Sequence, residues 1–316
     1  MKKTLSDELS FHQDMFGLRQ FLVDSTKRLV DVGTRRQLKL QIINMRQKVL
    51  PYGRPFPHFL IIGAMRAGTS SLFKYLDSNP DTAASLRKEI GFFTRYWAFG
   101  PEWYRAHFPI TGSRLAFEAT PDYLMHPLAP KRAADMMPNA KIIILLREPA
   151  ARAHSHYKHM VRLGFEKRTF DQALSEEDQT IKRGLDYLGS PEEEEFKEFL
   201  RFSYIMRGHY ADQLQAWLEK FPKKNVTIIW SEDLFKKTSE TLKQISDFLE
   251  IDSKKFSNIS RNYSAEDKGT AKSKQIKTSD FMPDWALERL NDKNQQLKHL
   301  LRSEFRDIKL PNWLQA

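Results

Sequence analysis

The fold class is indicated most strongly by residues 59–72, which read FLIIGAMRAGTSSL. An apolar run leads into a loop bounded by Gly63 and Gly68, and hydroxyl residues then begin a helix. Loop N–H groups and the positive end of the helix dipole together bind phosphate-like oxygens. The Gly63-x4-Gly68 spacing is that of a Walker A loop, but Thr69 stands where its lysine belongs, and the cation of the loop is Arg66. The stretch therefore predicts an anion cradle that is not built like an ATPase.

Bulk composition narrows the class of protein. The chain has 316 residues, 41% of them hydrophobic and 29% charged, which is typical of globular proteins. It contains no cysteine, which excludes disulfides, thiolate catalysis and cysteine zinc sites. No apolar run approaches the length of a membrane span, and no signal peptide is recognisable, so we expect a cytoplasmic protein.

Net charge is +11, which favours an anionic partner or simply aids solubility. No zinc-finger, RNA-recognition or basic-zipper pattern accompanies the charge, so we expect no nucleic-acid partner.

Residues 1–50 differ from the rest of the chain. Apolar side chains recur at roughly helical spacing among many lysines and arginines, which predicts an N-terminal helical extension. Such an extension packs on the main domain, or it docks on a partner or a membrane surface. Pro51, Gly53 and Pro55 interrupt the pattern. We therefore expect two parts, the extension at 1–50 and an α/β domain at 51–316.

The main domain alternates short apolar strands with amphipathic helices. Strands with two apolar faces are typical of a buried parallel sheet. The expected class is α/β, with a P-loop-like central parallel sheet flanked by helices. Strands are predicted at 58–63, 114–118, 141–147 and 225–230, and helices at 69–78, 128–136, 149–163, 203–220, 238–249 and 284–302, with a further helix from Ser190-Pro191.

Two motifs follow the loop in the chain. Lys88-Glu89 stands just ahead of Phe92-Phe93, where an apolar wall raises a carboxylate's pKa and suits it to accept a proton. Alternatively, Lys88 and Glu89 are ordinary surface residues, and the two phenylalanine rings belong to the core.

The second motif, Glu118-Ala-Thr-Pro-Asp-Tyr123, follows a strand, where α/β proteins bind ligands. Asp122 and Tyr123 are candidates for an acceptor pocket, although Thr-Pro-Asp is also good turn chemistry.

A third motif joins the strand at 141–147 to the helix that follows. Arg147 ends the strand and Ser155 lies on the helix, so a guanidinium and a hydroxyl can reach one phosphate. The nearby histidines at 154, 156 and 159 are scattered around the helix, so we expect no metal site. For the lysine-rich segment 266–277 two interpretations stay open: it closes over an anionic ligand, or it is an exposed loop.

Together these motifs resemble the sulfotransferases that use 3′-phosphoadenosine 5′-phosphosulfate. The likeness is greatest to the branch containing heparan sulfate sulfotransferases and their bacterial relatives. It covers about residues 58–305 and includes four motifs in the same order: the loop, Lys-Glu-x-x-Phe-Phe, Glu-x-Thr-Pro-x-Tyr, and Leu-Arg147-Glu-Pro with Ser155.

The resemblance implies sulfuryl transfer to a hydroxyl or amine of a carbohydrate or small-molecule acceptor. It releases adenosine 3′,5′-bisphosphate and requires no metal. Glu89 is the implied general base, and Arg66 holds the transferring group. The implied cofactor-binding residues are Arg66, Ala67, Gly68, Thr69, Ser70, Arg147, Ser155, Lys268 and Gly269, with Lys272 or Lys274 as substitutes for the last pair. The expected acceptor-binding residues are Lys88, Tyr123, His126 and Arg207, together with Tyr210.

The chain departs from the family pattern at two positions. Arg66 replaces the usual lysine, and Ala119 replaces a lysine of the heparan-type members. The cysteine pair and the Golgi anchor of the animal enzymes are not found either, which implies a cytoplasmic bacterial type. Two alternatives stay open: a non-catalytic anion- or glycan-binding protein on the same fold, and a P-loop nucleotide kinase. The kinase would need Gly-Lys-Ser/Thr and an aspartate where Arg147 stands.

Overall fold

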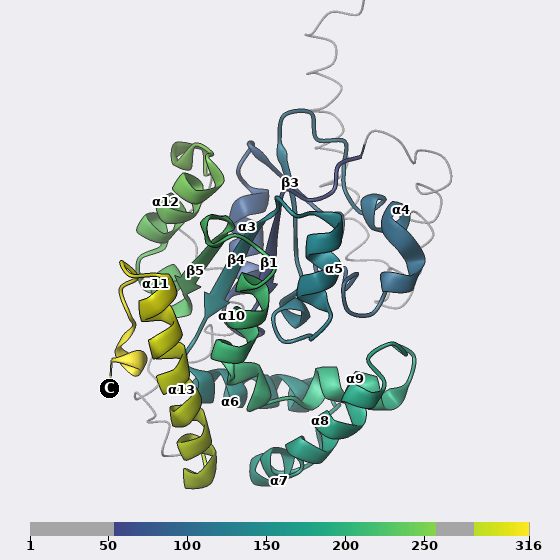
Figure 1. The fold of residues 1–316 in the computed structure, drawn as a ribbon, viewed down its shortest axis with the longest axis vertical. Coiled ribbons are helices and arrows are strands. Elements are labelled where there is room, and N and C mark those ends of the chain that lie inside the picture. The colour runs from purple at the N-terminus through teal and green to yellow at the C-terminus, as the bar shows by residue number, and fades with distance from the viewer. Residues whose placement is uncertain (1–53, 257–280, 316) are drawn as a thin grey trace, which may run out of the picture. The chain divides into compact units, whose positions relative to one another are not determined.

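The computed structural model describes residues 54–256 and 281–315 (Figure 1). Its centre is a five-stranded sheet in the order β2-β3-β1-β4-β5, with every pairing parallel. This confirms the predicted α/β class. The N-terminal extension expected at 1–50 lies outside the described residues. The strands are β1 Phe59–Gly63, β2 Thr82–Ala84, β3 Leu115–Ala119, β4 Lys141–Leu146 and β5 Val226–Trp230.

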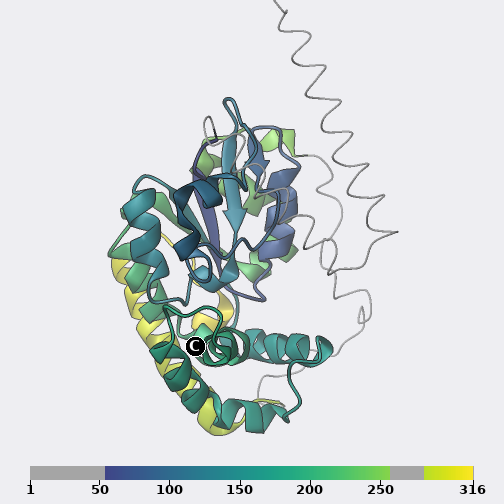
Figure 2. The same ribbon diagram turned by 90° about the vertical axis from the view of Figure 1, so that its right-hand side faces the viewer.

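Helices cover both faces of this sheet. In Figures 1 and 2, α5 and α10 lie against one face and α3 lies against the other. Among the described residues, no helix is both long enough and apolar enough to cross a membrane. The helices are α3 Thr69–Asp77, α4 Gly100–Arg105, α5 Ala129–Met136, α6 Pro149–Arg162, α7 Phe170–Ser175, α8 Glu177–Asp186, α9 Glu194–Phe202, α10 Tyr210–Leu218, α11 Ser231–Lys236, α12 Thr238–Leu249 and α13 Asp284–Glu304.

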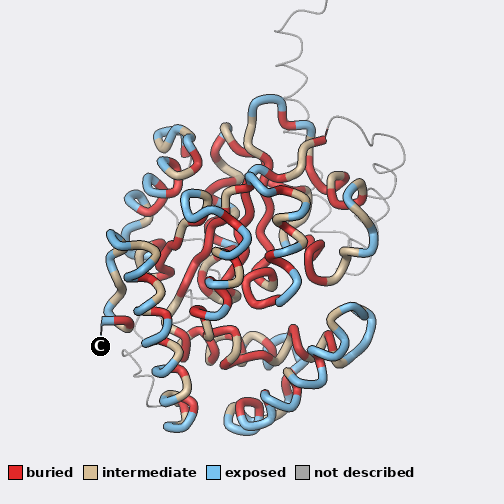
Figure 3. The backbone as a smooth tube through the Cα atoms, viewed as in Figure 1, coloured by how far each residue is buried: buried red, intermediate tan, exposed pale blue. Residues whose placement is uncertain are grey.

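The apolar strands form the core. Every residue of β1 is buried, and so are all residues of β4 after Lys141, as the colouring of Figure 3 shows. The rings of Phe59 and Phe117 stack across the β1–β3 pair, with centroids 4.8 Å apart. A strand that is apolar on both sides is stable only when both sides are covered, which explains why helices pack on each face.

The parallel arrangement brings three loops to one edge of the sheet. The loop after β1 is tied to β4, because the Ala64 N–H donates to the Leu145 carbonyl at 2.6 Å. The segment after β3 is tied to β1 by the N–H of Thr120, which donates to the Ile61 carbonyl at 3.1 Å. The motifs at 63–71, 118–123 and 147–155 therefore meet at the carboxyl edge of the sheet.

The predicted helix at 203–220 is wrong at its beginning. The α-helix starts only at Tyr210, after a short 3-10 turn at Met206–Gly208. The interruption falls at His209, whose φ of −77° and ψ of 63° are not helical. The buried Glu177 carboxylate stabilises the preceding turn, because it accepts the N–H groups of Ile205 at 2.7 Å and Met206 at 2.8 Å.

The helix expected from Ser190-Pro191 also begins later, at Glu194. Residues 190–193 form a turn, in which the Glu193 N–H donates to the Ser190 carbonyl at 3.1 Å. Sequence patterns missed β2, α4, α7, α8 and α11, which are all short except α8.

Helices α8 and α9 approach closely at Gly184, and this contact gives a test of the packing. A Cβ at Gly184 would lie 2.2 Å from the Cβ of Phe199. We expect Gly184→Ala to lower the free energy of unfolding by about 1–3 kcal/mol, because overpacking outweighs the gain in helix propensity. Urea unfolding measures the change. Gly189→Ala is the control, because nothing lies within 4 Å of its added Cβ; equal stabilities of the two variants would contradict the described packing.

Candidate active site

The loop after β1 leaves the N-terminus of α3 open to an anion. Gly68 is the N-cap residue, with φ of 101°, and α3 has no side-chain cap and no acidic residue in its first turn. A Cβ at Gly68 would lie 3.1 Å from side-chain atoms of both Leu234 and Phe235, so glycine is required by packing as well as by backbone angle. The positive end of the helix dipole therefore points to the carboxyl edge with no capping side chain from the described residues and no acid in its own first turn.

Helix α6, which starts at the same edge, is different. The Glu148 carboxylate caps it by accepting the N–H groups of Ala150 and Ala151. Burial raises the pKa of Glu148, and those two N–H donors oppose the shift. The α6 terminus is therefore occupied by a group of the protein, which makes α3 the better anion site of the two.

Three polar side chains from different elements converge beside the loop. The Nε of Arg66 donates to the hydroxyl of Ser155 on α6 at 3.2 Å. The Nη1 of Arg147, just beyond β4, donates to the carbonyl of Arg66 at 3.0 Å. The structure thus brings together Arg66, Arg147 and Ser155, three of the residues that sequence patterns had assigned to phosphate binding.

The electrostatic surroundings of Arg66 are positive. Burial and the charges of Arg147 and Arg162 lower the pKa of Arg66 to about 10, while Glu89 opposes that shift. The guanidinium stays protonated at pH 7. Burial and the same Arg66 and Arg162 charges lower the pKa of His159, again against the influence of Glu89. An anion bound here would relieve the repulsion among the arginines.

Glu89, the predicted base, is at the mouth of this site. Its side chain is 55% exposed and forms an ion pair with Lys88, a residue predicted from the sequence to bind the acceptor substrate. Its backbone has φ of 60°, and its N–H donates to the Ala119 carbonyl at 2.9 Å. The carboxylate is accessible to a ligand, whereas Phe92 and Phe93 are fully buried core.

The remaining predicted acceptor residues are buried instead of lining an open surface. Tyr123, His126, Arg207 and Tyr210 are each no more than 2% exposed. Arg207 is committed to Asp122 at 2.8 Å, and the Tyr210 hydroxyl donates to the Arg147 carbonyl at 3.0 Å. In this structure they support the site from below and cannot contact an acceptor directly, which corrects the expectation drawn from the sequence.

Other predicted cofactor residues differ in accessibility. Ala67 and Thr69 are buried, whereas Ser70 is exposed on the first turn of α3. Lys268, Gly269, Lys272 and Lys274 lie outside the described residues, so their assignment stays a prediction.

The three α6 histidines lie in separate environments. His154 stacks on Phe281 with centroids 4.2 Å apart, His156 is fully buried, and the Nδ1 of His159 lies 2.8 Å from an Arg162 nitrogen. Over residues 54–256 and 281–315, no group of three or more His, Asp or Glu side chains has the geometry of a metal site.

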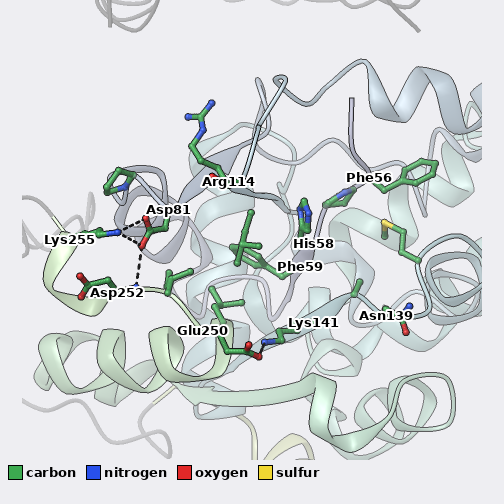
Figure 4. A pocket seen from close by; sticks show the side chains of 18 of the residues that line it. Phe56, His58, Phe59, Asp81, Arg114, Asn139, Lys141, Glu250, Asp252 and Lys255 are labelled. Carbon is green, nitrogen blue, oxygen red and sulfur yellow. Dashed lines mark hydrogen bonds and ion pairs between the residues drawn. The ribbon is translucent and has the colours of Figure 1, made fainter. Parts of the chain in front are cut away.

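A cavity of about 880 Å³ lies at the opposite, amino edge of the sheet (Figure 4). Its wall includes His58 and Lys141, at the starts of β1 and β4. Its lysines are already paired, Lys255 with Asp81 at 2.8 Å and Lys141 with Glu250 at 2.6 Å. None of the predicted site residues lines it, so we place the functional site at the carboxyl edge.

Sequence patterns missed several residues around the site. His159 and Arg162 follow Ser155 at helical spacing on the same side of α6, a signal that was available but was interpreted only as a failed metal pattern. Glu118 was noted as the first residue of a motif but was given no role, although a carboxylate inside an otherwise apolar strand is a sign of a buried polar role. Phe235 is 39% exposed beside Gly68, and no local pattern distinguished it.

Comparison with known proteins identifies the family. Residues 56–306 match the family model described as "Sulfotransferase domain". The chain therefore belongs to the sulfotransferase family, which confirms the predicted family and class of enzyme.

Named relatives are consistent with this assignment. The chain is 30% identical over 205 residues to bifunctional heparan sulfate N-deacetylase/N-sulfotransferase 1 of Caenorhabditis elegans, covering 63% of this chain and 22% of that protein. It is 30% identical over 200 residues to human heparan sulfate glucosamine 3-O-sulfotransferase 6, covering 63% of this chain and 54% of the human protein. The chain thus spans between a fifth and about half the length of these relatives.

Among solved structures, a sulfotransferase from Alicyclobacillus acidocaldarius is similar in fold. The TM-score is 0.62 at 24% identity, and the match covers 82% of this chain and 99% of that one. This likeness supports the fold assignment.

The ion pair of Asp122 with Arg207 gives a pH-dependent test of the framework. Burial works to raise the pKa of Asp122, but Arg207 and Arg95 outweigh it and lower that pKa. Because the pKa of Asp122 is lower in the folded protein than in the unfolded chain, its ionised carboxylate stabilises the fold at any pH above the ordinary carboxyl pKa of about 3.9. This stabilisation is lost as the pH falls through the pKa of the folded state. We expect Asp122→Asn to cost about 3–5 kcal/mol of unfolding free energy at pH 7, because Arg207 is left buried without its charge partner.

Urea unfolding at pH 7 and below pH 4 measures this cost, which should shrink at the lower pH. Asp212→Asn is the matched control, since Asp212 pairs with Lys293 at the surface at 2.9 Å and should cost less than about 1 kcal/mol. A pH-independent difference between Asp122→Asn and the wild type would contradict the lowered pKa.

Proposed function

We propose that this protein transfers a sulfuryl group from 3′-phosphoadenosine 5′-phosphosulfate to a hydroxyl or amine of an acceptor. The observation that carries the proposal is the convergence of Arg66, Arg147 and Ser155 beside the uncapped N-terminus of α3. A donor with two phosphate groups and a sulfate needs several fixed positive groups at one place, and this edge of the sheet provides them.

The residues present fit such a donor. The α3 terminus and Arg66 suit the phosphosulfate, while Arg147 and Ser155 suit the 3′-phosphate. Phe235, exposed next to Gly68, offers a flat apolar surface for an adenine ring. Neither Walker A lysine nor strand-end aspartate accompanies this loop, which disfavours a nucleotide kinase.

When bound, the donor supplies an activated sulfuryl group, whose bond to the 5′-phosphate oxygen breaks as the acceptor oxygen bonds to sulfur. Glu89 accepts the proton that the acceptor hydroxyl loses. Arg66 and the first amides of α3 stabilise negative charge on the moving group and on the departing phosphate. Arginine at position 66 keeps its charge throughout but does not donate a proton, unlike the lysine usual in the family.

The acceptor is proposed to be a carbohydrate or a small molecule. Relatives whose names specify heparan sulfate support a saccharide, and the positive charge near Arg66 and Arg162 suits an acidic one. Ala119, in place of the lysine of heparan-type members, separates this site from theirs. Of the residues predicted to bind the acceptor, Lys88 is the one that lies beside the exposed Glu89, and we propose that it contacts the acceptor. The bacterial cytoplasmic location stays a prediction from composition.

Removing the proposed base tests the chemistry. We expect Glu89→Gln to lower kcat by about 10²–10⁴-fold, because the amide cannot accept the acceptor's proton. The affinity for adenosine 3′,5′-bisphosphate should not change, since Arg147 and the loop are intact. Transfer of labelled sulfate to a panel of saccharide and phenolic acceptors measures the rate. Glu219→Gln, at an exposed position just after α10, is the control. Full activity in Glu89→Gln would refute the role of Glu89.

The role of Arg147 is tested with two ligands that differ by one phosphate. We expect Arg147→Ala to weaken the binding of adenosine 3′,5′-bisphosphate by about 10–100-fold, because charge-assisted hydrogen bonds to the phosphate are lost. The affinity for adenosine 5′-phosphate should fall much less. Calorimetry gives both dissociation constants, and an equal loss for the two ligands would contradict contact with the 3′-phosphate.

A further inference from the structure

We propose that Glu118 is a positioning residue for the reaction: a buried carboxylate that orients two hydroxyls, which in turn hold the backbone of residues 89–92. This inference rests on the proposed function, because its purpose is to present Glu89 to the acceptor. Glu118 lies on β3 and is 0% exposed. It cannot touch the substrate, so it acts through the loop that carries Glu89.

Three hydroxyls satisfy the Glu118 carboxylate. Tyr104 and Tyr123 each donate to Oε1 at 2.7 Å. Thr120 donates to Oε2 at 2.7 Å. Burial raises the pKa of Glu118, and the same three donors oppose that shift. The two carboxyl oxygens of Glu118 are thus engaged by hydroxyl groups, Oε1 by two and Oε2 by one.

The carboxylate sets the polarity of two of these hydroxyls. Because Thr120 and Tyr123 use their hydroxyl hydrogens to donate to Glu118, their oxygen lone pairs are left to accept from elsewhere. Thr120 accepts the N–H of Gly91 at 3.2 Å, and Tyr123 accepts the N–H of Phe92 at 2.8 Å. Each hydroxyl therefore links the buried charge to a consecutive backbone amide of the loop.

The loop needs such support. Glu89 and Gly91 both have left-handed backbone, with φ of 60° and 74°. A residue other than glycine holds this conformation only when its surroundings enforce it. The Glu89 N–H donates to the Ala119 carbonyl at 2.9 Å, so the end of β3 also holds the loop directly.

Aromatic side chains also pack against this hydrogen-bond network. Phe92 stacks on Tyr104 with centroids 4.3 Å apart, and Phe93 packs edge-on against Tyr123 at 5.1 Å. The two tyrosines that donate to Glu118 thus also hold the rings that follow Glu89. A shift of the network would move the carboxylate of Glu89 relative to the acceptor, and small displacements of a reacting group reduce rate more than binding.

A matched pair of substitutions at Thr120 tests this inference. Thr120→Val keeps the shape and removes the hydroxyl, which leaves the Gly91 N–H without its acceptor; Thr120→Ser keeps the hydroxyl. We expect Thr120→Val to lower kcat at least tenfold, with KM for the acceptor and the Kd for adenosine 3′,5′-bisphosphate within about twofold of wild type. Thr120→Ser should restore kcat. The control Thr241→Val changes a buried threonine on α12 and should leave kcat unaltered.

Amide hydrogen exchange of the peptide containing Gly91 and Phe92 provides a readout that needs no catalysis. Exchange there should accelerate in Thr120→Val and in Tyr123→Phe, but not in Thr120→Ser. If the wild type transfers no sulfate while exchange follows this pattern, the proposed function fails and the positioning network stands. If the wild type is active and Thr120→Val matches it in kcat and exchange, the inference is overturned. A parallel loss of kcat and ligand-binding stoichiometry would likewise overturn it, because that pattern indicates unfolding.

Discussion

The site depends on one constraint, the parallel pairing of β1 with both β3 and β4. Three strands that run in the same direction must end at the same edge, so the segments that follow them meet there. The bond from the Ala64 N–H to the Leu145 carbonyl then fixes the loop after β1 against β4. Arg66 and Arg147, 81 residues apart in the chain, become neighbours as a result.

This geometry brings several positively charged side chains together at the carboxyl edge of the sheet. Arg147 and Arg162 both disfavour the protonated form of Arg66, and the first turn of α3 carries no acid. Such an arrangement costs stability in the free protein and favours a bound anion, which is the usual signature of a site kept for function. The carboxylate of Glu89 is near enough to oppose the lowering of the Arg66 pKa, and the bond from the Glu89 N–H to the Ala119 carbonyl fixes its backbone at the end of β3.

Much of this was predictable from local sequence. Apolar runs identified β1, β3, β4 and β5 to within about one residue, because a strand buried on both faces leaves a clear signal. The convergence of the loop with Arg147 and Ser155 followed from the rule that parallel strands end together. The roles proposed for Glu89, Arg147 and Ser155 came from resemblance to a family and stay predictions, while the three residues themselves follow segments at one edge of the sheet.

What could not be predicted depends on partners distant in the chain. Asp122 pairs with Arg207 from 85 residues away, so no local pattern revealed that Arg207 is buried in the framework. The helix expected from residue 203 begins only after a turn, which the carboxylate of Glu177 stabilises by accepting N–H groups 28 and 29 residues further along the chain. Tyr123 looked like a pocket residue because its motif follows a strand, yet the hydroxyl is engaged by Glu118.

The most direct test of the central claim is a calorimetric titration of the wild-type protein with adenosine 3′,5′-bisphosphate in the presence of a metal chelator. A parallel titration uses ATP with Mg²⁺. The account predicts saturable, one-to-one binding of the bisphosphate without metal, at least tenfold tighter than Mg-ATP. Preference for Mg-ATP, or binding of neither ligand, would contradict it.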